Sequence, residues 1–364
     1  MSKYKVAVYA ISKNEEQFVD RWCDSVMEAD EVIVLDTGST DNTILKLKNR
    51  GVKVYSEVID PWRFDVARNK SLDYVSDDID ICLCIDLDEV VSPGWRNILE
   101  SNWDDSITRC RYDYVWSHDK DNKPLVNFYI DKIHSRYNYK WTHPVHEVLT
   151  YIGDKEEKYI LLDNIRVDHY PDSNKSRSSY LPLLELSVKE DPLDDRNMHY
   201  LGREYMFYQM WDKCIETLKK HLSLKSATWK DERCASMRFI ARSYYNLGNI
   251  ELARIWYEKA INEAPYLKDG YVELGLLEYN LGNYSDACIY LEESLKIKGN
   301  RKSYINESFC NDNTVYDVLS ICKYNLKEYK DSLYYVVMAY NMDKDNERIK
   351  NNKKLIEDMI CITD

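Results

Sequence analysis

The sequence is poor in the two residues that most often interrupt regular structure, with ten glycines and eight prolines among 364 residues. Because flexible and stiff linkers are built from such residues, this scarcity argues against a long linker. No stretch approaches the roughly 20 apolar residues of a membrane-spanning helix. The N-terminal segment is too short and too polar for a secretory signal and predicts the first strand instead. We therefore expect a cytoplasmic chain without a membrane span.

Positive charge is also in deficit, because the formal net charge is −13. Proteins that bind the backbone of DNA or RNA need clustered Lys and Arg, so this balance argues against a nucleic-acid partner. The ten cysteines form no C-x-x-C pair and have no partner histidine at zinc-finger spacing. They indicate reduced thiols rather than a disulfide framework.

The chain has the length and composition of a two-domain globular protein. It contains 44% hydrophobic and 31% charged residues, and each half is long enough to bury its own core. Residues 1–173 alternate apolar strands with helical stretches, which predicts an α/β domain with a parallel sheet. Residues 174–364 show helical patterns only, which predicts an all-α domain.

The first domain is expected to begin with four strands and three helices. The strands are predicted at 5–11, 31–36, 52–58 and 81–86, and the helices at 18–27, 44–50 and 67–74. Ser12 or Asn14 is the expected cap of the first helix. Ser39, Thr40 and Asp41 are expected to cap the second, since such residues prefer helix starts.

Three acids, Asp86, Asp88 and Glu89, follow the apolar run 81–85. Because side chains alternate along a strand, we expect Asp86 and Asp88 to point the same way at its carboxyl end. Two carboxylates on one face repel each other unless a cation lies between them. A divalent ion with oxygen ligands meets that need and can also hold a diphosphate. An acidic surface turn is the alternative.

Two other segments have the composition of a nucleotide site. The turn 37–43 leaves a predicted strand and enters a helix, which is where parallel α/β folds bind nucleotides. Gly38 lets the backbone approach a ligand, and Asp36 is expected to accept hydrogen bonds from a ribose or a base. Arg68, near the start of a predicted helix, either holds a diphosphate in bidentate fashion or pairs with an acid.

In their order along the chain, these segments resemble the motifs of the family 2 glycosyltransferases. The resemblance rests on Asn14-Glu15-Glu16, on 36–43, on 62–69 and on Asp86-Leu87-Asp88-Glu89. Members of that family have the GT-A fold, use nucleotide sugars and usually invert the anomeric carbon. The resemblance implies that Asp36 contacts the nucleoside. It also implies that Asp86 and Asp88 form a D-x-D motif that holds Mn²⁺ or Mg²⁺ against the sugar diphosphate.

One group of these enzymes has a Trp-to-His-Glu segment followed by an aromatic-flanked histidine, which resembles 141–147 and His169. His169 is the candidate third metal ligand beside the D-x-D motif, since imidazole readily completes a carboxylate site. Glu147 is the candidate general base that takes the proton of the acceptor. His146 is a second candidate in this segment. Three other histidines are expected to be structural: His118, His134 and His143.

The resemblance predicts an inverting, metal-dependent hexosyltransferase, with a UDP-sugar as the first donor to test. The candidate nucleotide-sugar-binding residues are Ala10, Ser12, Glu15, Asp36, Ser39, Arg68, Asp86, Leu87 and Asp88.

The second half contains an internal repeat. Asn246-Leu247-Gly248 recurs 34 residues later as Asn280-Leu281-Gly282, and Ala253 and Ala287 keep the same offset. A helix-turn-helix period of 34 residues resembles the tetratricopeptide repeat, and Pro265 follows one unit where that pattern places a proline. A later copy contains Asn325-Leu326, and an earlier one runs through Leu201, Gly202, Tyr205 and Cys214.

Stacked hairpins of this kind complete one another's core and present a concave surface that commonly holds a peptide or a protein. Glycosyltransferases that modify peptides resemble this combination of domains, which favours a protein or peptide acceptor; a glycan acceptor stays open. A structural arm that forms a homodimer is an alternative role for the repeats. Two alternatives exist for the whole chain: a non-catalytic scaffold with a degenerate transferase domain, and a transferase acting on hydroxymethylated DNA.

Overall fold

The computed structural model describes residues 3–119, 121–172, 179–299 and 305–363. Contacts divide the chain into two compact units, Met1–Glu190 and Asp191–Asp364. The domain boundary predicted after residue 173 lies outside the described residues. Helix α5 (Tyr180–Glu190) groups with the first unit.

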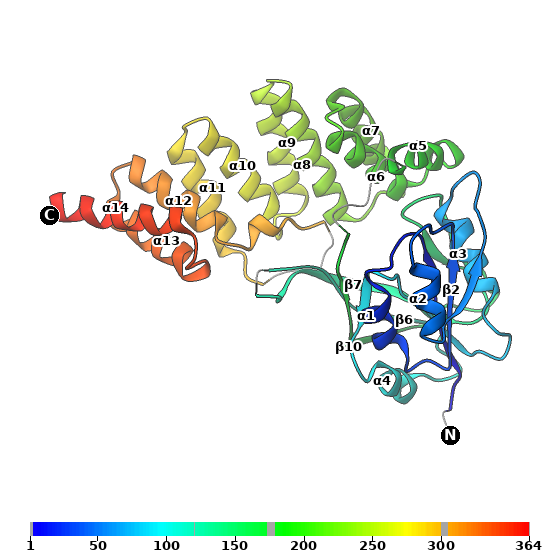
Figure 1. The fold of residues 1–364 in the computed structure, drawn as a ribbon. Helices are drawn as coiled ribbons and strands as arrows, with labels where there is room; N and C mark the ends of the chain where they lie inside the picture. The colour runs from blue at the N-terminus through cyan, green and yellow to red at the C-terminus, as the bar shows by residue number, and fades with distance from the viewer. Residues whose placement is uncertain (1–2, 120, 173–178, 300–304, 364) are drawn as a thin grey trace. The chain divides into compact units, whose positions relative to one another are not determined.

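A mixed sheet of eight strands forms the centre of the first unit (Figure 1). Its order is β3-β2-β1-β4-β7-β6-β10-β5. The predicted parallel sheet is confirmed for the β3-β2-β1-β4 half. The rest of the sheet is mixed: β7 runs antiparallel to both of its neighbours and β5 antiparallel to β10, whereas β6 and β10 are parallel, so the prediction of an all-parallel sheet is wrong there. The strands are β1 Val6–Ser12, β2 Glu31–Asp36, β3 Lys53–Ser56, β4 Ile81–Cys84, β5 Glu89–Val91, β6 Arg109–His118, β7 Pro124–Ser135 and β10 Tyr159–His169.

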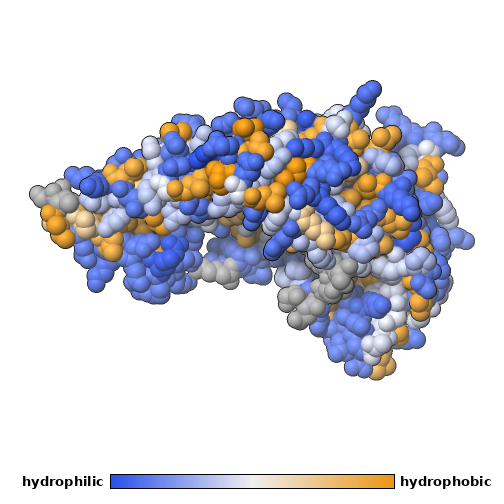
Figure 2. All heavy atoms as spheres, turned by 90° about the horizontal axis from the view of Figure 1, so that it is seen from above, coloured by the Kyte–Doolittle hydropathy of each residue, from blue (hydrophilic) through white to orange (hydrophobic). Residues whose placement is uncertain are grey.

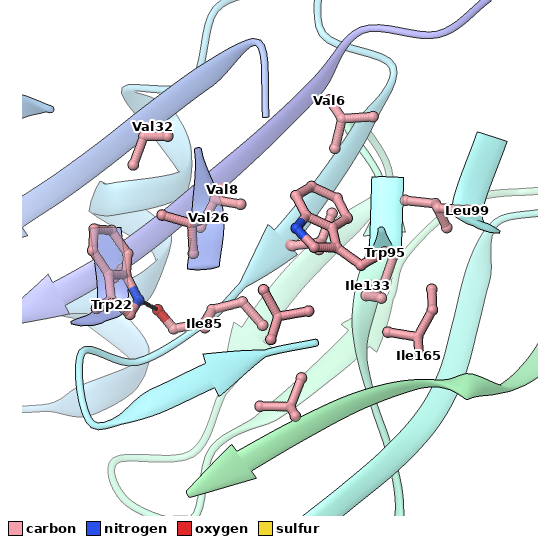
Figure 3. Close-up of a cluster of buried hydrophobic side chains, with 14 of the residues drawn as sticks. Val6, Val8, Trp22, Val26, Val32, Ile85, Trp95, Leu99, Ile133 and Ile165 are labelled. Atoms are coloured by element: carbon pink, nitrogen blue, oxygen red, sulfur yellow. Dashed lines mark hydrogen bonds between the residues drawn. The ribbon is translucent and has the colours of Figure 1, made fainter. Parts of the chain in front are cut away.

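Each face of this sheet has its own core, because the residues of β1 alternate between the two faces. Val6 and Val8 pack with the helices α1, α2 and α4, where Trp22 and Trp95 are fully buried (Figure 3). Tyr9 points to the other face and packs with α3 and a small sheet of two strands. The covering elements are α1 Val19–Val26, α2 Thr43–Asn49, α3 Phe64–Asp73, α4 Trp95–Asn102, β8 Tyr139–Thr142 and β9 Val148–Tyr151.

The core also fixes the backbone that follows β4. The indole nitrogen of Trp22 donates a hydrogen bond of 3.1 Å to the carbonyl of Ile85 (Figure 3). Ile85 and Leu87 are both fully buried. Since buried side chains on either side of Asp86 cannot move without opening the core, the acidic turn is held rigidly.

Predicted helix caps are largely wrong in this unit. The residue before α1 is Phe18, and no side chain caps that helix. Ser12 instead ends strand β1, while Asn14 has a φ of +54° and accepts a hydrogen bond of 2.7 Å from the backbone nitrogen of Thr40. Both residues therefore tie loops together rather than start a helix.

Of the three caps predicted for α2, only Asp41 contacts the helix start. Its Oδ1 accepts a hydrogen bond of 3.0 Å from the backbone nitrogen of Thr43, the first residue of α2. Thr40 binds Asn14 across the loop, and Ser39 turns toward the preceding strand. The interpretation of Ser39 and Thr40 as caps is therefore wrong, because Ser39 binds Asp36 and Thr40 binds Asn14 instead of the helix start.

The second unit is a succession of antiparallel helix pairs, coloured from green to red in Figure 1. Each pair turns through one residue with positive φ: Gln209, Gly248, Gly282 and Lys327, at +57°, +78°, +79° and +63°. The predicted repeat and its earlier and later copies are thereby confirmed as helical hairpins. The helices are α6 Asp195–Phe207, α7 Trp211–Ser223, α8 Lys230–Asn246, α9 Ile250–Glu263, α10 Asp269–Asn280, α11 Tyr284–Lys296, α12 Thr314–Asn325, α13 Tyr329–Met342 and α14 Glu347–Thr363.

Small residues allow the two helices of a pair to cross closely. A Cβ added at Gly275 of α10 would lie 2.6 Å from Leu291 Cγ of α11, and one added at Gly202 of α6 would collide with Leu218 of α7. Both glycines lie seven positions before the positive-φ residue of their own pair. The repeat is therefore one of packing as well as of sequence.

The surface and the cysteines have the properties that the composition predicts. No helix among the described residues has both the length and the apolar character needed to cross a bilayer. On the face seen in Figure 2, hydrophobic residues are interspersed among hydrophilic ones. All ten cysteines are free thiols, and nine of them are buried.

Candidate active site

The acidic motif lies on the turn between β4 and β5 rather than on a strand. Strand β4 ends at Cys84, and the backbone nitrogen of Glu89 donates 2.9 Å to the carbonyl of Asp86 to close the turn. The Glu89 carboxylate accepts a second bond, of 2.8 Å, from the nitrogen of Asp86. The expectation that Asp86 and Asp88 continue the strand is therefore wrong, because β4 ends at Cys84 and both acids lie on the turn.

Strand pairing brings His169 to the second acid of the motif. In the antiparallel pair of β5 and β10, Glu89 lies opposite His169. The backbone nitrogen of Tyr170 donates 2.8 Å to the carbonyl of Asp88, and His169 Nε2 lies 3.5 Å from Asp88 Oδ2. Burial would lower the pKa of His169, but its hydrogen bond to Asp88 and the charge of that carboxylate outweigh burial and raise it.

The first acid of the motif, Asp86, is held by two cations. Arg68 donates to both of its oxygens, at 2.7 and 2.9 Å, and Lys132 Nζ lies 3.0 Å from Oδ2. Burial would raise the pKa of Asp86, yet the charges of Arg68 and Lys132 prevail and keep it well below its usual range. Asp86 is therefore ionised and turned toward protein cations in this state.

As a result, the three predicted metal ligands do not converge on one point. Within the described ranges, a single group of three His, Cys, Asp or Glu side chains has ligand atoms all within 4.8 Å of one another, and it lies in the second unit. The structure brings Asp88 and His169 together and holds Asp86 apart from them.

Arg68 also reaches the candidate general base. Its Nε donates to Glu147 Oε1, its Nη1 lies 3.1 Å from the sulfur of Cys84, and its guanidinium lies 5.2 Å from the centre of the Trp141 ring. Of the two alternatives for Arg68, pairing with acids is the one observed. A single buried guanidinium thus joins the first acid of the motif to the candidate base.

Lys132 is a member of this site that the sequence did not reveal. It projects from β7 and contacts Glu89 at 3.2 Å as well as Asp86. The hydroxyl of Tyr114, on β6, donates 2.9 Å to the same Glu89. Burial raises the pKa of Glu89, and the Lys132 charge opposes that rise. Locally, Lys132 looks like any solvated strand lysine, so no motif could have identified it.

An aromatic side chain lies over the histidine of the site. Trp116 on β6 stacks on His169 with ring centres 4.6 Å apart, and half of its surface is exposed. This arrangement leaves an open indole face beside the Asp88–His169 pair. No predicted element or motif of the sequence included Trp116.

Asp36 organises the loop after β2. Its carboxylate accepts from the hydroxyls of Ser12 and Ser39, at 3.0 and 2.5 Å, and from the backbone nitrogens of Gly38 and Ser39, at 3.0 and 2.8 Å. Gly38 has a φ of +109°, which only glycine adopts readily. In this state Asp36 therefore shapes the loop with both of its oxygens.

Three other candidate nucleotide-sugar residues have buried side chains. Ala10 and Leu87 are fully enclosed in the core beneath α1 and α4, so only their backbone atoms are placed to meet a ligand. Glu15 is also buried, and its backbone nitrogen donates 2.8 Å to the hydroxyl of Thr43.

The remaining histidines of this unit have local partners. His134 is buried, bonds the hydroxyl of Tyr9 at 2.9 Å, and has its pKa lowered by burial to about 3. His118 contacts Asp168 at 2.7 Å. His143 and His146 occupy positive-φ positions of the loop that carries the candidate base.

Comparison with known proteins agrees with the division into two units. Residues 8–105 match the family described as glycosyl transferase family 2, and residues 239–266 and 269–301 match the tetratricopeptide repeat. The first match includes β1, the Asp36 loop, Arg68 and the acidic turn. The second covers most of the helices α8 to α11.

Relatives of known sequence carry the same assignment. An uncharacterized glycosyltransferase of Rickettsia bellii is 30% identical over 142 residues, which are 38% of this chain and 47% of that protein. Another, from Rickettsia typhi, is 22% identical over 273 residues, which are 74% of this chain and 81% of that protein. The chain thus matches about half the length of the first relative. Among solved structures, that of MamA is 18% identical, covers 49% of this chain and 99% of its own, and has a TM-score of 0.38.

Proposed function

We propose that this chain, which joins a family 2 glycosyltransferase domain to tetratricopeptide repeats, transfers a sugar from a nucleotide-diphosphate donor to another molecule. One observation supports this above all others. Asp88, on the turn after strand β4, lies 3.5 Å from His169, and Asp86 on the same turn is held by two cations, Arg68 and Lys132. The carboxyl ends of parallel strands are the usual ligand site of open α/β sheets.

The donor in this proposal is a UDP-sugar. The nucleoside binds near the Asp36 loop, whose rigid backbone is set by Ser12, Gly38 and Ser39. Arg68 and Lys132 face the diphosphate. A guanidinium recognises phosphate oxygens in bidentate fashion, and both cations are already held ionised in this site.

The metal in this proposal is Mn²⁺ or Mg²⁺, bound by Asp88 and His169 and by Asp86 once that residue is released from its cations. Carboxylates with one imidazole form a donor set that suits Mn²⁺. When bound, the ion offsets the charge of the departing diphosphate. The rest of the charge compensation comes from the Arg68 and Lys132 side chains.

The reaction is an inverting displacement by the acceptor. The acceptor oxygen, nitrogen or sulfur forms a bond to the anomeric carbon as the bond to the diphosphate breaks, and the acceptor proton passes to Glu147. Arg68 orients Glu147 through its Nε. The acceptor in this proposal is a protein, a peptide or a glycan, and the repeats hold it or form a homodimer. The free thiols favour the cytoplasm as its compartment.

A second candidate function, a non-catalytic scaffold, is favoured by one specific feature. Asp86 and Glu147 both form ion pairs with Arg68, which is an arrangement typical of a structural ion network. A transferase acting on DNA is disfavoured by the net charge of −13.

The test is hydrolysis and transfer with a panel of nucleotide sugars, with and without Mn²⁺. We expect metal-dependent release of nucleoside diphosphate from at least one donor, and its loss in Asp88→Asn. The matched control is Asp163→Asn, an exposed acid of the same strand that carries His169. Its turnover should equal that of the parent. Absence of turnover and of binding across the whole panel would favour the scaffold.

A further inference from the structure

The connection between α11 and α12 is longer than the other connections between neighbouring helix pairs of the second unit. Residues 297–313 join these two helices, whereas residues 264–268 join α9 to α10. The described residues 305–311, called the inserted segment below, contact the earlier helices α8 and α10 (Figure 1). Other helix pairs are joined without such residues, so the need to connect two helices does not account for this segment.

Two side chains hold the backbone of the inserted segment as they would hold a peptide. The guanidinium of Arg238 on α8 donates a hydrogen bond of 2.8 Å to the carbonyl of Ile305. The backbone nitrogen of Glu307 donates one of 2.8 Å to the carboxylate of Asp269, the first residue of α10. Glu307 has an extended backbone, with φ −94° and ψ 138°. Because these contacts use main-chain groups, any extended peptide offers the same acceptor and donor.

The acidic side chain of the inserted segment adds a charged contact to the same face. Arg242 Nη2 lies 2.6 Å from Glu307 Oε1, and Arg242 Nε donates 2.7 Å to Glu273 on α10. The side chains of Arg242 and Glu307 are 25% and 27% exposed, so solvent reaches this pair. Glu273 also pairs with Arg238, and these pairs join α8 to α10 without the segment. Glu307 can therefore leave while the two helices stay connected.

The inserted segment does not fill the space beside this face. A pocket of about 220 Å³ lies between the segment, the start of α10 and the residues after α11, and its lining includes Lys268, Asp269, Asn306 and Asn311. Since well-fitted parts of a protein pack closely, a pocket of this size marks an incomplete fit. The face therefore has room for a larger occupant than the segment.

We propose that the face formed by α8 and α10 binds an extended acidic peptide of a partner protein, and that the inserted segment is the chain's own occupant of this site. The partner offers a main-chain carbonyl to Arg238 and a main-chain nitrogen to Asp269. The residue that supplies this nitrogen also offers a carboxylate to Arg242. The role of the peptide as the acceptor of a sugar rests on the proposed function, whereas the binding site does not.

The test measures binding and needs no turnover, so its failure is distinct from failure of the proposed function. The probe is a fluorescent peptide with the sequence of residues 305–311 and serine in place of Cys310, and anisotropy reports its binding to the full chain. The parent should bind it weakly, because a tethered segment competes at a roughly millimolar effective concentration. Glu307→Gln removes a charged hydrogen bond of the segment and should bind the probe at least about 10-fold more tightly.

The matched control is Glu263→Gln, which removes an acid of α9 that pairs with Arg233 of α8. It should bind the probe as the parent does. A second probe, with glutamine in place of Glu307, should bind the Glu307→Gln chain at least about 10-fold more weakly than the acidic probe, since it offers no charge to Arg242. This comparison changes the peptide only, so it does not depend on the folding of a further variant.

The reactivity of Cys310 shows where the probe binds. Cys310 is only 3% exposed, and displacement of the inserted segment should make its thiol react faster with iodoacetamide, as mass spectrometry detects. The exposed Cys361 is the internal reference and should react at an unchanged rate.

Three results would overturn the proposal. The first is the absence of probe binding by the folded Glu307→Gln chain, or binding no tighter than in the parent. The second is equal affinity of that chain for the acidic and the glutamine probe. The third is binding that leaves the reactivity of Cys310 unchanged, because the probe then lies on another surface.

Discussion

Each unit of this chain contains a network of two cations and three acids, and the two networks differ in where they lie. In the first unit the members are Arg68, Lys132, Asp86, Glu89 and Glu147. In the second they are Arg238, Arg242, Asp269, Glu273 and Glu307. The number of charges is the same, so burial of charge by itself does not distinguish a site from a structural network.

The location of each network distinguishes them. The first network begins where β4 ends and adjoins the Asp88–His169 pair and the open face of Trp116. The second is enclosed between α8 and α10, where Arg238 is only 1% exposed and contacts Glu273 at 2.5 Å. We infer that the first network exchanges its partners for a ligand, whereas the second holds neighbouring repeats together.

The largest expected effect comes from removing the central cation of each network. Arg68→Met and Arg238→Met each leave buried carboxylates unpaired, and each should lower the free energy of unfolding of its own unit by about 3–5 kcal/mol. Only Arg68→Met should also abolish turnover of the nucleotide sugar. Denaturant unfolding, followed by turnover per folded molecule, checks both statements.

The control for this pair is the conservative change Arg68→Lys, which keeps the charge but loses the bidentate geometry. It should preserve most of the stability and little of the turnover. Equal turnover in Arg68→Met and Arg238→Met, measured on folded protein, would remove the distinction between the two networks.

The second-largest expected effect is a loss of stability of the helical unit at low pH. Burial would raise the pKa of Glu273, but Arg242 and Arg238 lower it from 4.5 to about 2. A depressed pKa stabilises the fold above the unfolded-state value and loses that contribution as the pH falls toward 2. The shift corresponds to about 3 kcal/mol. The stability difference between the parent and Glu273→Gln should shrink by that amount between pH 5 and pH 2.

Urea unfolding at a series of pH values measures this slope. Asp286→Asn, which alters an acid in the first turn of α11 with no resolved interaction in the network, is the control and should retain the parent slope. A slope in Glu273→Gln equal to that of the parent would show that the second network contributes nothing to acid stability.

A smaller effect is expected from the packing between helices of one pair. In Gly275→Ala the new methyl group would lie 2.6 Å from Leu291 Cγ, and overpacking of this kind costs about 1–3 kcal/mol. The Tm of the helical unit reports the change. If Gly275→Ala destabilised that unit more than Arg238→Met, then close helix packing and not the ion network would dominate its stability.

The smallest effect is a gain. Lys327 has a φ of +63° at the turn position that Gly248 and Gly282 occupy in their own pairs. A left-handed conformation costs a residue with a Cβ about 1 kcal/mol. Lys327→Gly should therefore raise the stability of the helical unit by roughly that amount, as seen in a Tm increase of a few degrees. Gly248→Lys should lower it comparably.

The sequence predicted most of what local pattern determines. Strand β2 was predicted with its observed bounds, and the 34-residue period located the hairpins of α8 to α11. The mixed half of the sheet was missed, because strand direction depends on pairings between distant segments rather than on periodicity. The caps of α1 and α2 were misassigned because Asn14 and Ser39 bond to each other and because Asn14 also accepts from Thr40, which are contacts between two loops distant in sequence.

For the candidate site, the sequence motifs predicted that Asp88 and His169 lie close together, but they did not predict which side chains contact Asp86. Asp88 and His169 do lie together, yet it is the pairing of β5 with β10 that achieves this. Pairing of Arg68 with an acid was one of two alternatives, but the second partner of Asp86, Lys132, was not predicted because it belongs to a strand that no motif covers. Partner choice inside a buried network depends on three-dimensional packing, which a spacing rule does not contain.

The central claim is that a nucleoside diphosphate is held at the end of β4 through a metal bound by Asp88 and His169. Calorimetric titration of UDP in the presence and absence of Mn²⁺ tests it most directly. We predict that UDP binds the parent and Asp163→Asn only when Mn²⁺ is present, and that folded Asp88→Asn shows no such binding. Equal UDP affinity in Asp88→Asn and the parent would contradict the claim.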